Sequence, residues 1–159
     1  MTKDREDEYT RAEVIGVYPI MIGSQQIPSF VMLIEGIDWG GKVLPIFIGV
    51  NEAIAIERAL KGIRLERPMT HDLLVNILET LEIRIERITI DALLENSIYT
   101  ATIVLSKNVN GKEQHYYIDA RPSDSVAIAL RAGAPIYVAS HLKKYAKDQN
   151  ELVFIGDEG

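Results

Sequence analysis

Asn51-Glu52-Ala53-Ile54-Ala55-Ile56 and Ser123-Asp124-Ser125-Val126-Ala127-Ile128 lie 72 residues apart and match position by position. Each stretch has a residue that can cap a helix, then an acid, then four small or β-branched residues. The same shift places Val31-Met32-Leu33 on Ile103-Val104-Leu105. We interpret these matches as an internal repeat, with halves at about residues 12–62 and 83–138.

Runs rich in Val, Ile, Tyr and Phe precede each repeated stretch and predict three antiparallel strands in each half. Asn110-Gly111 is the strongest hairpin-turn signal in the chain. Pro45 cannot donate a ladder hydrogen bond, so we expect its strand at an edge or bulged. The predicted strands are residues 12–22, 28–35, 42–49, 83–94, 98–106, 113–119 and a short one at 136–138.

Apolar residues at helical spacing predict three helices. Asn51 caps the first, which stops near Gly62; Thr70 caps the second; Ser123 caps the third, which ends at Gly133 and Pro135. A last helical turn or two is expected at residues 140–147. The second helix has an apolar stripe that we expect to pack on the sheet, made of Leu73, Leu74, Ile77, Leu78 and Leu81.

The order strand, strand, strand, helix occurs twice, which predicts an α+β fold. Two small half-sheets can bury their apolar faces only against each other. We therefore expect a strongly curved, barrel-like, mostly antiparallel sheet built from two β-β-β-α repeats, with the helices packed outside. One domain is expected at residues 11–155, after a flexible lead-in at 1–10 and before a frayed end at 156–159.

The composition of the chain excludes several classes of function. The 159 residues carry a formal net charge of −6, so any nucleic acid must be contacted locally rather than across a strongly basic surface. The absence of cysteine excludes disulfides, thiolate metal sites and a cysteine nucleophile. No signal peptide or membrane-spanning run is present, so we expect a soluble cytoplasmic protein without membrane contact.

Two polar segments stand where a helix is expected to begin: Arg67-Pro68-Met69-Thr70-His71-Asp72 and Asp119-Ala120-Arg121-Pro122-Ser123-Asp124. A helix N-terminus beside an arginine suits a phosphate group. We therefore predict phosphate contacts from Arg67, Arg121, Thr70 and Ser123. The alternative is purely structural, because Ser or Thr caps a helix and Asp in its first turn complements the dipole.

His71 is the best candidate for a catalytic side chain, because it is the histidine that stands beside an acid, Asp72. A neutral imidazole can take a proton from water or, once protonated, give one to a leaving oxygen. We group Asp72 and Asp124 with it as catalytic candidates. A histidine in a first helical turn can also be an ordinary surface residue, and His115 and His141 are interpreted as structural.

A divalent cation, Mg or Mn, is a possible cofactor for phosphodiester chemistry, held by carboxylates from separate elements. Glu52, Asp119 and Asp124 are the predicted ligands. Glu52 and Asp124 occupy equivalent places in the repeat, so a pseudo-twofold fold would let them approach each other. The alternative is that these acids serve only their own helices.

Four motifs in order resemble the bifunctional nuclease family across about residues 14–138. They are Leu44–Gly49, Glu52–Ile56, Arg67–Leu73 and Ile118–Ala127. The resemblance implies an α+β barrel-like sheet of two related halves, homo-oligomers with a dimer favoured, and DNase and RNase activity. Two positions depart from the family pattern: Ser125, where alanine is common, and Glu82, where a glycine often ends the second helix.

We therefore expect a nuclease that hydrolyses DNA and RNA, with nucleic acid as its partner. The chain has no phosphate-binding glycine loop, dinucleotide fingerprint or serine-hydrolase elbow, so kinase, dehydrogenase and triad-hydrolase interpretations lose their support. The alternative is a non-catalytic oligomeric binding or regulatory module for a phosphorylated ligand or a protein partner. A third hypothesis is that the motifs have only a structural role, at the junctions between strands and helices in the two repeats.

Overall fold

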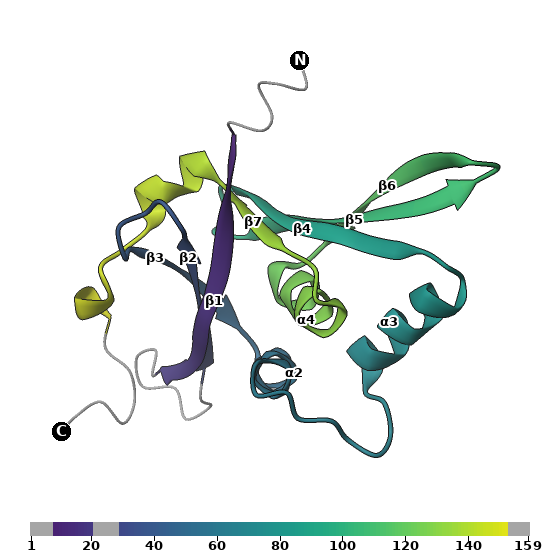
Figure 1. The fold of residues 1–159 in the computed structure, drawn as a ribbon. Helices are drawn as coiled ribbons and strands as arrows, with labels where there is room; N and C mark the ends of the chain where they lie inside the picture. The colour runs from purple at the N-terminus through teal and green to yellow at the C-terminus, as the bar shows by residue number, and fades with distance from the viewer. Residues whose placement is uncertain (1–7, 21–28, 153–159) are drawn as a thin grey trace.

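The computed structural model describes residues 8–20 and 29–152 of the chain. They form a mixed α+β fold with a seven-stranded, mostly antiparallel sheet (Figure 1). The expectations for residues 1–7, for the strand residues 21, 22 and 28 and for the C-terminal end at 156–159 lie outside the described residues. The strands are β1 (Tyr9–Ile20), β2 (Ser29–Gly36), β3 (Val43–Ile48), β4 (Arg84–Leu93), β5 (Tyr99–Val109), β6 (Lys112–Ala120) and β7 (Ile136–Ala139).

The strand order is β3-β2-β1-β7-β4-β5-β6. Each half contributes three consecutive antiparallel strands, and β7 lies between them, antiparallel to β1 and parallel to β4. The sheet has two edge strands, β3 and β6, and does not close on itself. The α+β, mostly antiparallel part of the prediction is confirmed, whereas the barrel-like closure is not.

Three α-helices lie together on one side of the sheet: α2 (Val50–Leu60), α3 (Thr70–Thr80) and α4 (Pro122–Ala132). Figure 1 shows them in the angle between the strands of the two halves, not around the outside of a barrel. The bounds of α2 and α4 differ by the same 72 residues that relate the two sequence motifs. Two short 3-10 helices follow, at Ser140–Tyr145 and Gln149–Glu151.

All three predicted caps are wrong by one or two residues. The helices begin after Gly49, Met69 and Arg121, and no side-chain oxygen of these residues caps them. Asn51, Thr70 and Ser123 are therefore helical residues, not caps. The shared feature is instead an acid at the third helical position, Glu52, Asp72 or Asp124, where a carboxylate can reach back to the start of its helix.

The apolar stripe of α3 does not pack on the sheet, which corrects the prediction. Val75 is the one buried residue of this helix, whereas Leu73, Ile77 and Leu81 are 51%, 45% and 54% exposed. Helix α3 packs against α4 and makes little contact with the sheet, lying below the start of β4 in Figure 1. Periodicity identified the helix correctly, but it could not specify which partner covers the apolar face.

Two local predictions are confirmed. Asn110 and Gly111 have φ values of 53° and 80°, as the turn of the β5–β6 hairpin requires. Pro45 lies on β3, an edge strand, opposite Leu33 of β2.

The main core lies between the sheet and helices α2 and α4. Side chains from both halves meet there, so burial couples the two halves into one unit. Fully buried members include Met32, Ile34, Ile56, Ile88, Val126 and Val138.

Ser125 of α4 is fully buried, and its hydroxyl has no hydrogen-bond partner among the described residues. Because an unpaired buried hydroxyl costs free energy, we expect Ser125→Ala to raise the free energy of unfolding by about 1 kcal/mol. Urea unfolding at pH 7 measures this. Ser106→Ala is the matched control, because Ser106 is also buried but accepts a hydrogen bond from Arg84 Nε at 3.3 Å. Destabilisation by Ser125→Ala would contradict the conclusion that the Ser125 hydroxyl is buried without a hydrogen-bond partner.

Glu82 follows the C-terminus of α3 with a φ of 59°, which favours glycine. Its N–H donates to Glu79 O at 3.0 Å, and the Ile83 N–H donates to Leu78 O at 2.8 Å, the pattern of a Schellman motif. We expect Glu82→Gly to raise the free energy of unfolding by about 0.5–1 kcal/mol. Thermal unfolding measures the change, with Glu82→Ala as the control. If backbone strain is the cause, Glu82→Ala does not stabilise the protein. Equal stabilisation by Glu82→Ala and Glu82→Gly would show instead that loss of the charge is the cause.

Candidate functional site

Side chains from the first turns of all three helices meet in one chain of contacts. His71 Nε2 of α3 lies 3.0 Å from Asp124 Oδ1 of α4. Asp124 Oδ2 accepts a hydrogen bond from Arg121 Nε at 3.3 Å, and the same guanidinium donates to Glu52 Oε1 of α2 at 3.3 Å. Residues up to 72 positions apart in sequence thus form one polar cluster, which we call the helix-start cluster: Glu52, His71, Arg121 and Asp124.

Local sequence explains why these side chains face one another. Helices α2 and α4 pack together, and each carries its acid at the third helical position. Pro122 occupies the first helical position of α4, where its missing N–H costs nothing. In α2, a Cβ on Gly49 would lie 2.5 Å from Glu52 Oε2, so glycine leaves room for that carboxylate over the helix start.

The contact between His71 and Asp124 favours one tautomer of a neutral imidazole. An ionised carboxylate can only accept a hydrogen bond, so in that tautomer Nε2 carries the proton and Nδ1 has the free lone pair. The side chains of His71 and Asp124 are 17% and 34% exposed, so the pair is sheltered but reachable. This arrangement can take a proton from a water molecule beside the ring.

Asp72 points to different partners from its neighbour His71. Its Oδ1 accepts from Arg131 Nε of α4 at 2.7 Å, and its Oδ2 accepts from the Met69 N–H at 2.9 Å. Burial alone would raise the pKa of Asp72, but these two donors outweigh it and hold the pKa below its usual value. Asp72 therefore stays ionised and ties the first turn of α3 to α4.

The other predicted site residues lie outside these contacts. Arg67 and Thr70 are exposed, and Asp119 is exposed on β6. Within residues 8–20 and 29–152, no hydrogen bond or ion pair involves their side chains. Ser123 is 6% exposed and turned into the protein, so its hydroxyl has little access to a ligand. The structure thus brings together Glu52, His71, Arg121 and Asp124, with Asp72 beside them.

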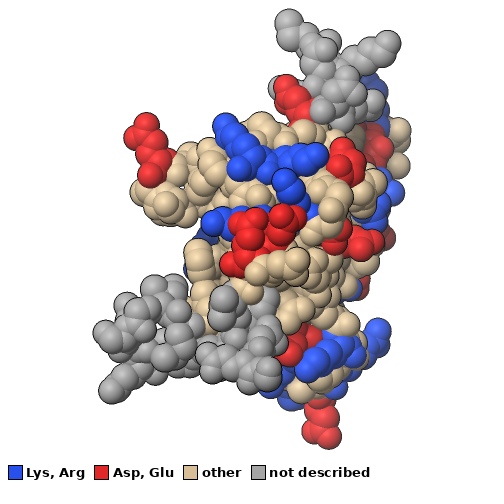
Figure 2. All heavy atoms as spheres, turned by 90° about the vertical axis from the view of Figure 1, so that its left-hand side faces the viewer, with Lys and Arg blue, Asp and Glu red and all other residues tan. Residues whose placement is uncertain are grey.

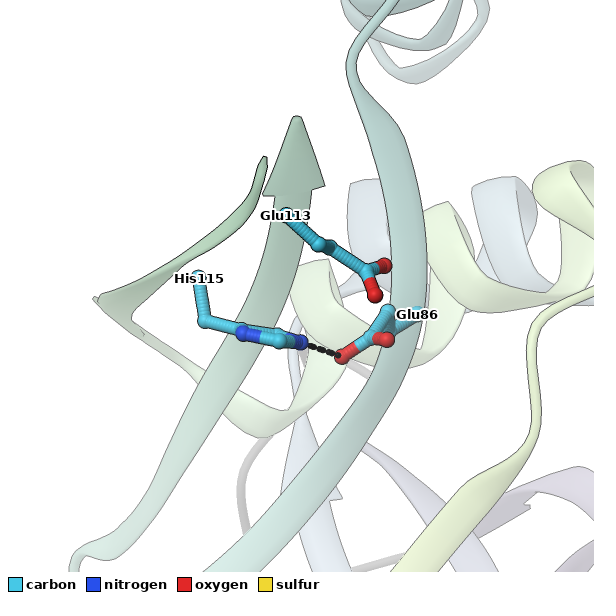
Figure 3. Close-up of side chains that lie close together, drawn as sticks. All are labelled: Glu86, Glu113 and His115. Atoms are coloured by element: carbon cyan, nitrogen blue, oxygen red, sulfur yellow. Dashed lines mark ion pairs between the residues drawn. The ribbon is translucent and has the colours of Figure 1, made fainter. Parts of the chain in front are cut away.

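The predicted metal ligands do not form a compact donor group. The Arg121 guanidinium lies between the carboxylates of Glu52 and Asp124, and Asp119 makes no contact with either. In the part of the chain that the structure describes, Glu86, Glu113 and His115 alone bring three possible donor atoms within 4.8 Å of one another. Figure 3 shows these three side chains converging from two strands of the sheet.

This Glu-Glu-His group could hold a metal ion, although arginines already neutralise its carboxylates. His115 Nε2 lies 3.2 Å from Glu86 Oε2, and Arg84 pairs with Glu86 and Glu113 at 3.1 and 3.0 Å. Glu86 lies on β4, which follows the end of α3, whereas His71 lies in the first turn of that helix, about 14 Å along the axis from its last residue. Sequence reasoning missed the group; the one local signal is that Glu113 and His115 alternate along β6 and so share a face.

Of two further arginines in this region, the sequence marked Arg58 only as one of four cations around the end of the first helix, with Lys61, Arg64 and Arg67, and it did not mark Arg131. Arg131 is 10% exposed and holds Asp72, and Arg58 of α2 donates to Met69 Sδ at 3.0 Å. Both lie near helix C-termini, where a cation is expected for the helix dipole alone, so the sequence could not show the contacts that they make.

The distribution of charged side chains on the surface is consistent with the negative net charge of the chain. On the face shown in Figure 2, Lys and Arg side chains are interspersed with Asp and Glu instead of forming a continuous basic surface. No helix of the described residues is long and apolar enough to cross a membrane.

Comparison with known proteins gives a consistent result. The sequence profile described as the bifunctional nuclease domain matches residues 31–151. An uncharacterized protein of Mycobacterium tuberculosis is 41% identical over 99 residues, which cover 62% of this chain and 56% of that protein. Bifunctional nuclease 2 of Arabidopsis thaliana is 27% identical over 117 residues, 72% of this chain and 34% of the plant protein. Bifunctional nuclease 1 of Oryza sativa subsp. indica is 25% identical over 111 residues, 70% and 33% respectively. The chain thus spans about half or a third of the length of these relatives.

Proposed function

Because this chain belongs to the bifunctional nuclease domain family, we propose that it is a nuclease that hydrolyses phosphodiester bonds of DNA and RNA at the helix-start cluster. The observation that carries the proposal is the 3.0 Å contact between His71 of α3 and Asp124 of α4. It pairs an imidazole with an orienting carboxylate at the junction of three helix N-termini, where N–H groups favour an anion.

In the proposed reaction, His71 Nδ1 takes a proton from a water molecule as the water oxygen attacks phosphorus. The bond between phosphorus and the leaving oxygen breaks, and that oxygen takes a proton from solvent. Asp124 holds the ring by accepting from Nε2 and stabilises the imidazolium that forms. Arg121, whose side chain is 68% exposed, and Arg67 supply positive charge for the phosphate oxygens.

Assistance by Mg or Mn stays part of the proposal, but this mechanism takes no step through a metal. With Arg121 bridging Glu52 and Asp124, these carboxylates and Asp119 do not fit a shared ion as they stand. The donor set that fits a divalent ion is Glu86, Glu113 and His115, two carboxylates and an imidazole. An ion there would lie at the other end of α3 from His71.

The test is incubation of the purified chain with supercoiled plasmid DNA and with single-stranded RNA, with Mg²⁺, with Mn²⁺ and with a chelator. The proposal expects cleavage of both polymers above that of a His71→Gln, Asp124→Asn double variant. Loss of cleavage in chelator would assign a metal to the reaction. Cleavage no greater than that of the double variant under all conditions would refute the nuclease assignment.

A homodimer and a cytoplasmic location also stay predictions. The exposed apolar stripe of α3, with Leu73, Ile77 and Leu81, is a surface that a second copy could cover. The binding-module alternative keeps one specific support, a pocket on the other side of Asp72 that contains several arginines.

A further inference from the structure

A pocket of about 550 Å³ lies between the C-terminal half of α2, the segment at residues 62–68, α3 and the end of α4. Ligand pockets for small molecules commonly measure about 300–1,000 Å³. Asp72 and Arg131 line it, but His71, Asp124 and Glu52 do not. The pocket therefore adjoins the helix-start cluster without containing the proposed base or its orienting carboxylate.

Arg58 brings to the pocket a guanidinium that forms no ion pair among the described residues. It is half-buried, and among the described residues its hydrogen-bond partner is the thioether sulfur of Met69, at 3.0 Å. A thioether is a weak acceptor and carries no charge, so most donors of this guanidinium are left for another group. The nearby Arg131, by contrast, is paired with a carboxylate, Asp72, and also donates to Ala127 O. An anion within reach of Arg58 would form charge-assisted hydrogen bonds, and a phosphate can accept two at once.

Part of the lining is apolar, beside the polar and charged side chains of Arg64, Glu66, Asn76 and Glu79. Val75 and Leu130 contribute from α3 and α4, and Ile63 and Leu65 contribute from the connecting segment. Ile63 and Leu65 are 51% and 45% exposed, so part of this wall faces solvent. Covering such a surface with a flat apolar group releases water and is favourable. Inorganic phosphate alone would satisfy Arg58 and leave the wall uncovered.

We propose that this pocket binds a nucleoside monophosphate, with its phosphate on Arg58 and its base against Leu65 and Leu130. Arg58 offers donors for the phosphate, Leu65 and Leu130 offer apolar contacts for the base, and the volume of about 550 Å³ accommodates both. Glu66 and Glu79 also line the pocket, but both are exposed and hydrated, so they oppose the phosphate only weakly. The inference does not depend on the nuclease proposal, because it uses neither His71 nor Asp124.

Isothermal titration of the full chain with adenosine monophosphate, adenosine and inorganic phosphate tests this inference. The monophosphate is expected to bind at least tenfold tighter than either of the other two. Arg58→Gln is expected to weaken its binding at least tenfold. Lys61→Gln is the matched control and should change the affinity less than twofold, because Lys61 lies one turn away, is paired with Glu57 and is 62% exposed.

His71→Gln separates the two proposals, since it should abolish cleavage and leave the affinity for adenosine monophosphate within twofold. If Arg58→Gln fails to fold, Leu65→Asn replaces it and should weaken the monophosphate more than inorganic phosphate. Absence of binding at millimolar concentration, equal binding by Arg58→Gln, or loss of binding in His71→Gln would each overturn the inference. Inorganic phosphate binding as tightly as the monophosphate would overturn it too.

Discussion

Replacing His71 with glutamine is expected to lower the turnover of DNA and RNA cleavage by a factor of about 10² to 10⁴. Glutamine is polar and of similar size, and it keeps a donor for Asp124, but it has no basic nitrogen to take a proton from water. The free energy of unfolding should change by less than about 1 kcal/mol, because one side-chain hydrogen bond is altered. Initial rates with labelled single-stranded RNA, at saturating and subsaturating substrate, measure the effect.

His115→Gln is the matched control for this prediction. His115 is also paired with a carboxylate, Glu86, but it lies on β6, away from the first turn of α3. Its replacement should leave turnover within about threefold if the reaction occurs at the helix-start cluster. A larger loss from His115→Gln than from His71→Gln would move the site of chemistry to the Glu-Glu-His group on the sheet.

Replacing Arg131 with leucine is expected to lower the free energy of unfolding by about 2 kcal/mol and to loosen α3. Arg131 is 10% exposed and donates to Asp72 and to Ala127 O, so its loss leaves both acceptors without their cation. This expected loss of about 2 kcal/mol is smaller than the full cost of breaking a buried ion pair, because the side chain of Asp72 is 36% exposed and can be hydrated. Urea unfolding measures the total, and hydrogen exchange of the α3 amides measures the local part.

Most of the loss should appear as easier local opening of α3, because this helix has a single buried residue, Val75, to hold it otherwise. Cleavage should fall with it, since His71 moves with the first turn of α3. Arg84→Leu is the control: Arg84 is 67% exposed and pairs with two glutamates, and such surface pairs contribute about 0–1 kcal/mol. Unchanged exchange in α3 after Arg131→Leu would contradict this role of Arg131.

The sequence predicted most of the elements because their signals are local. Runs rich in β-branched and aromatic residues predicted the strands, and Asn110-Gly111 predicted the hairpin turn. The match between segments 72 residues apart predicted that α2 and α4 occupy equivalent positions in the two halves. The helix starts were misplaced because Asn51, Thr70 and Ser123 are good caps in isolation. Their sequences could not show that the acid at the third helical position, not the hydroxyl or amide, faces the helix start.

Long-range features were predicted less well for a physical reason: they depend on which surfaces meet. The apolar stripe of α3 predicted a buried face that is in fact exposed. The same sequence reasoning grouped Glu52 with Asp124 as metal ligands, but could not see that Arg121 would lie between them. The roles of Arg58 and Arg131 arise only when α2, α3 and α4 are packed together.

The two departures from the family pattern correspond to local costs in the structure. Ser125 places an unpaired hydroxyl in the core, and Glu82 takes a backbone conformation that favours glycine. Both can be removed without touching the helix-start cluster. The two stabilising substitutions, combined, therefore provide a more stable background for testing the site variants.

The most direct test of the account is a double-mutant cycle on cleavage rate with wild type, His71→Gln, Asp124→Asn and the double variant. If the two residues act as one unit, each single change lowers kcat by a large factor and the double variant is within about threefold of the worse single variant. If the losses of the two single variants instead multiply in the double variant, or if wild type cleaves no faster than the double variant, the claim that His71 of α3 and Asp124 of α4 form one catalytic unit is contradicted.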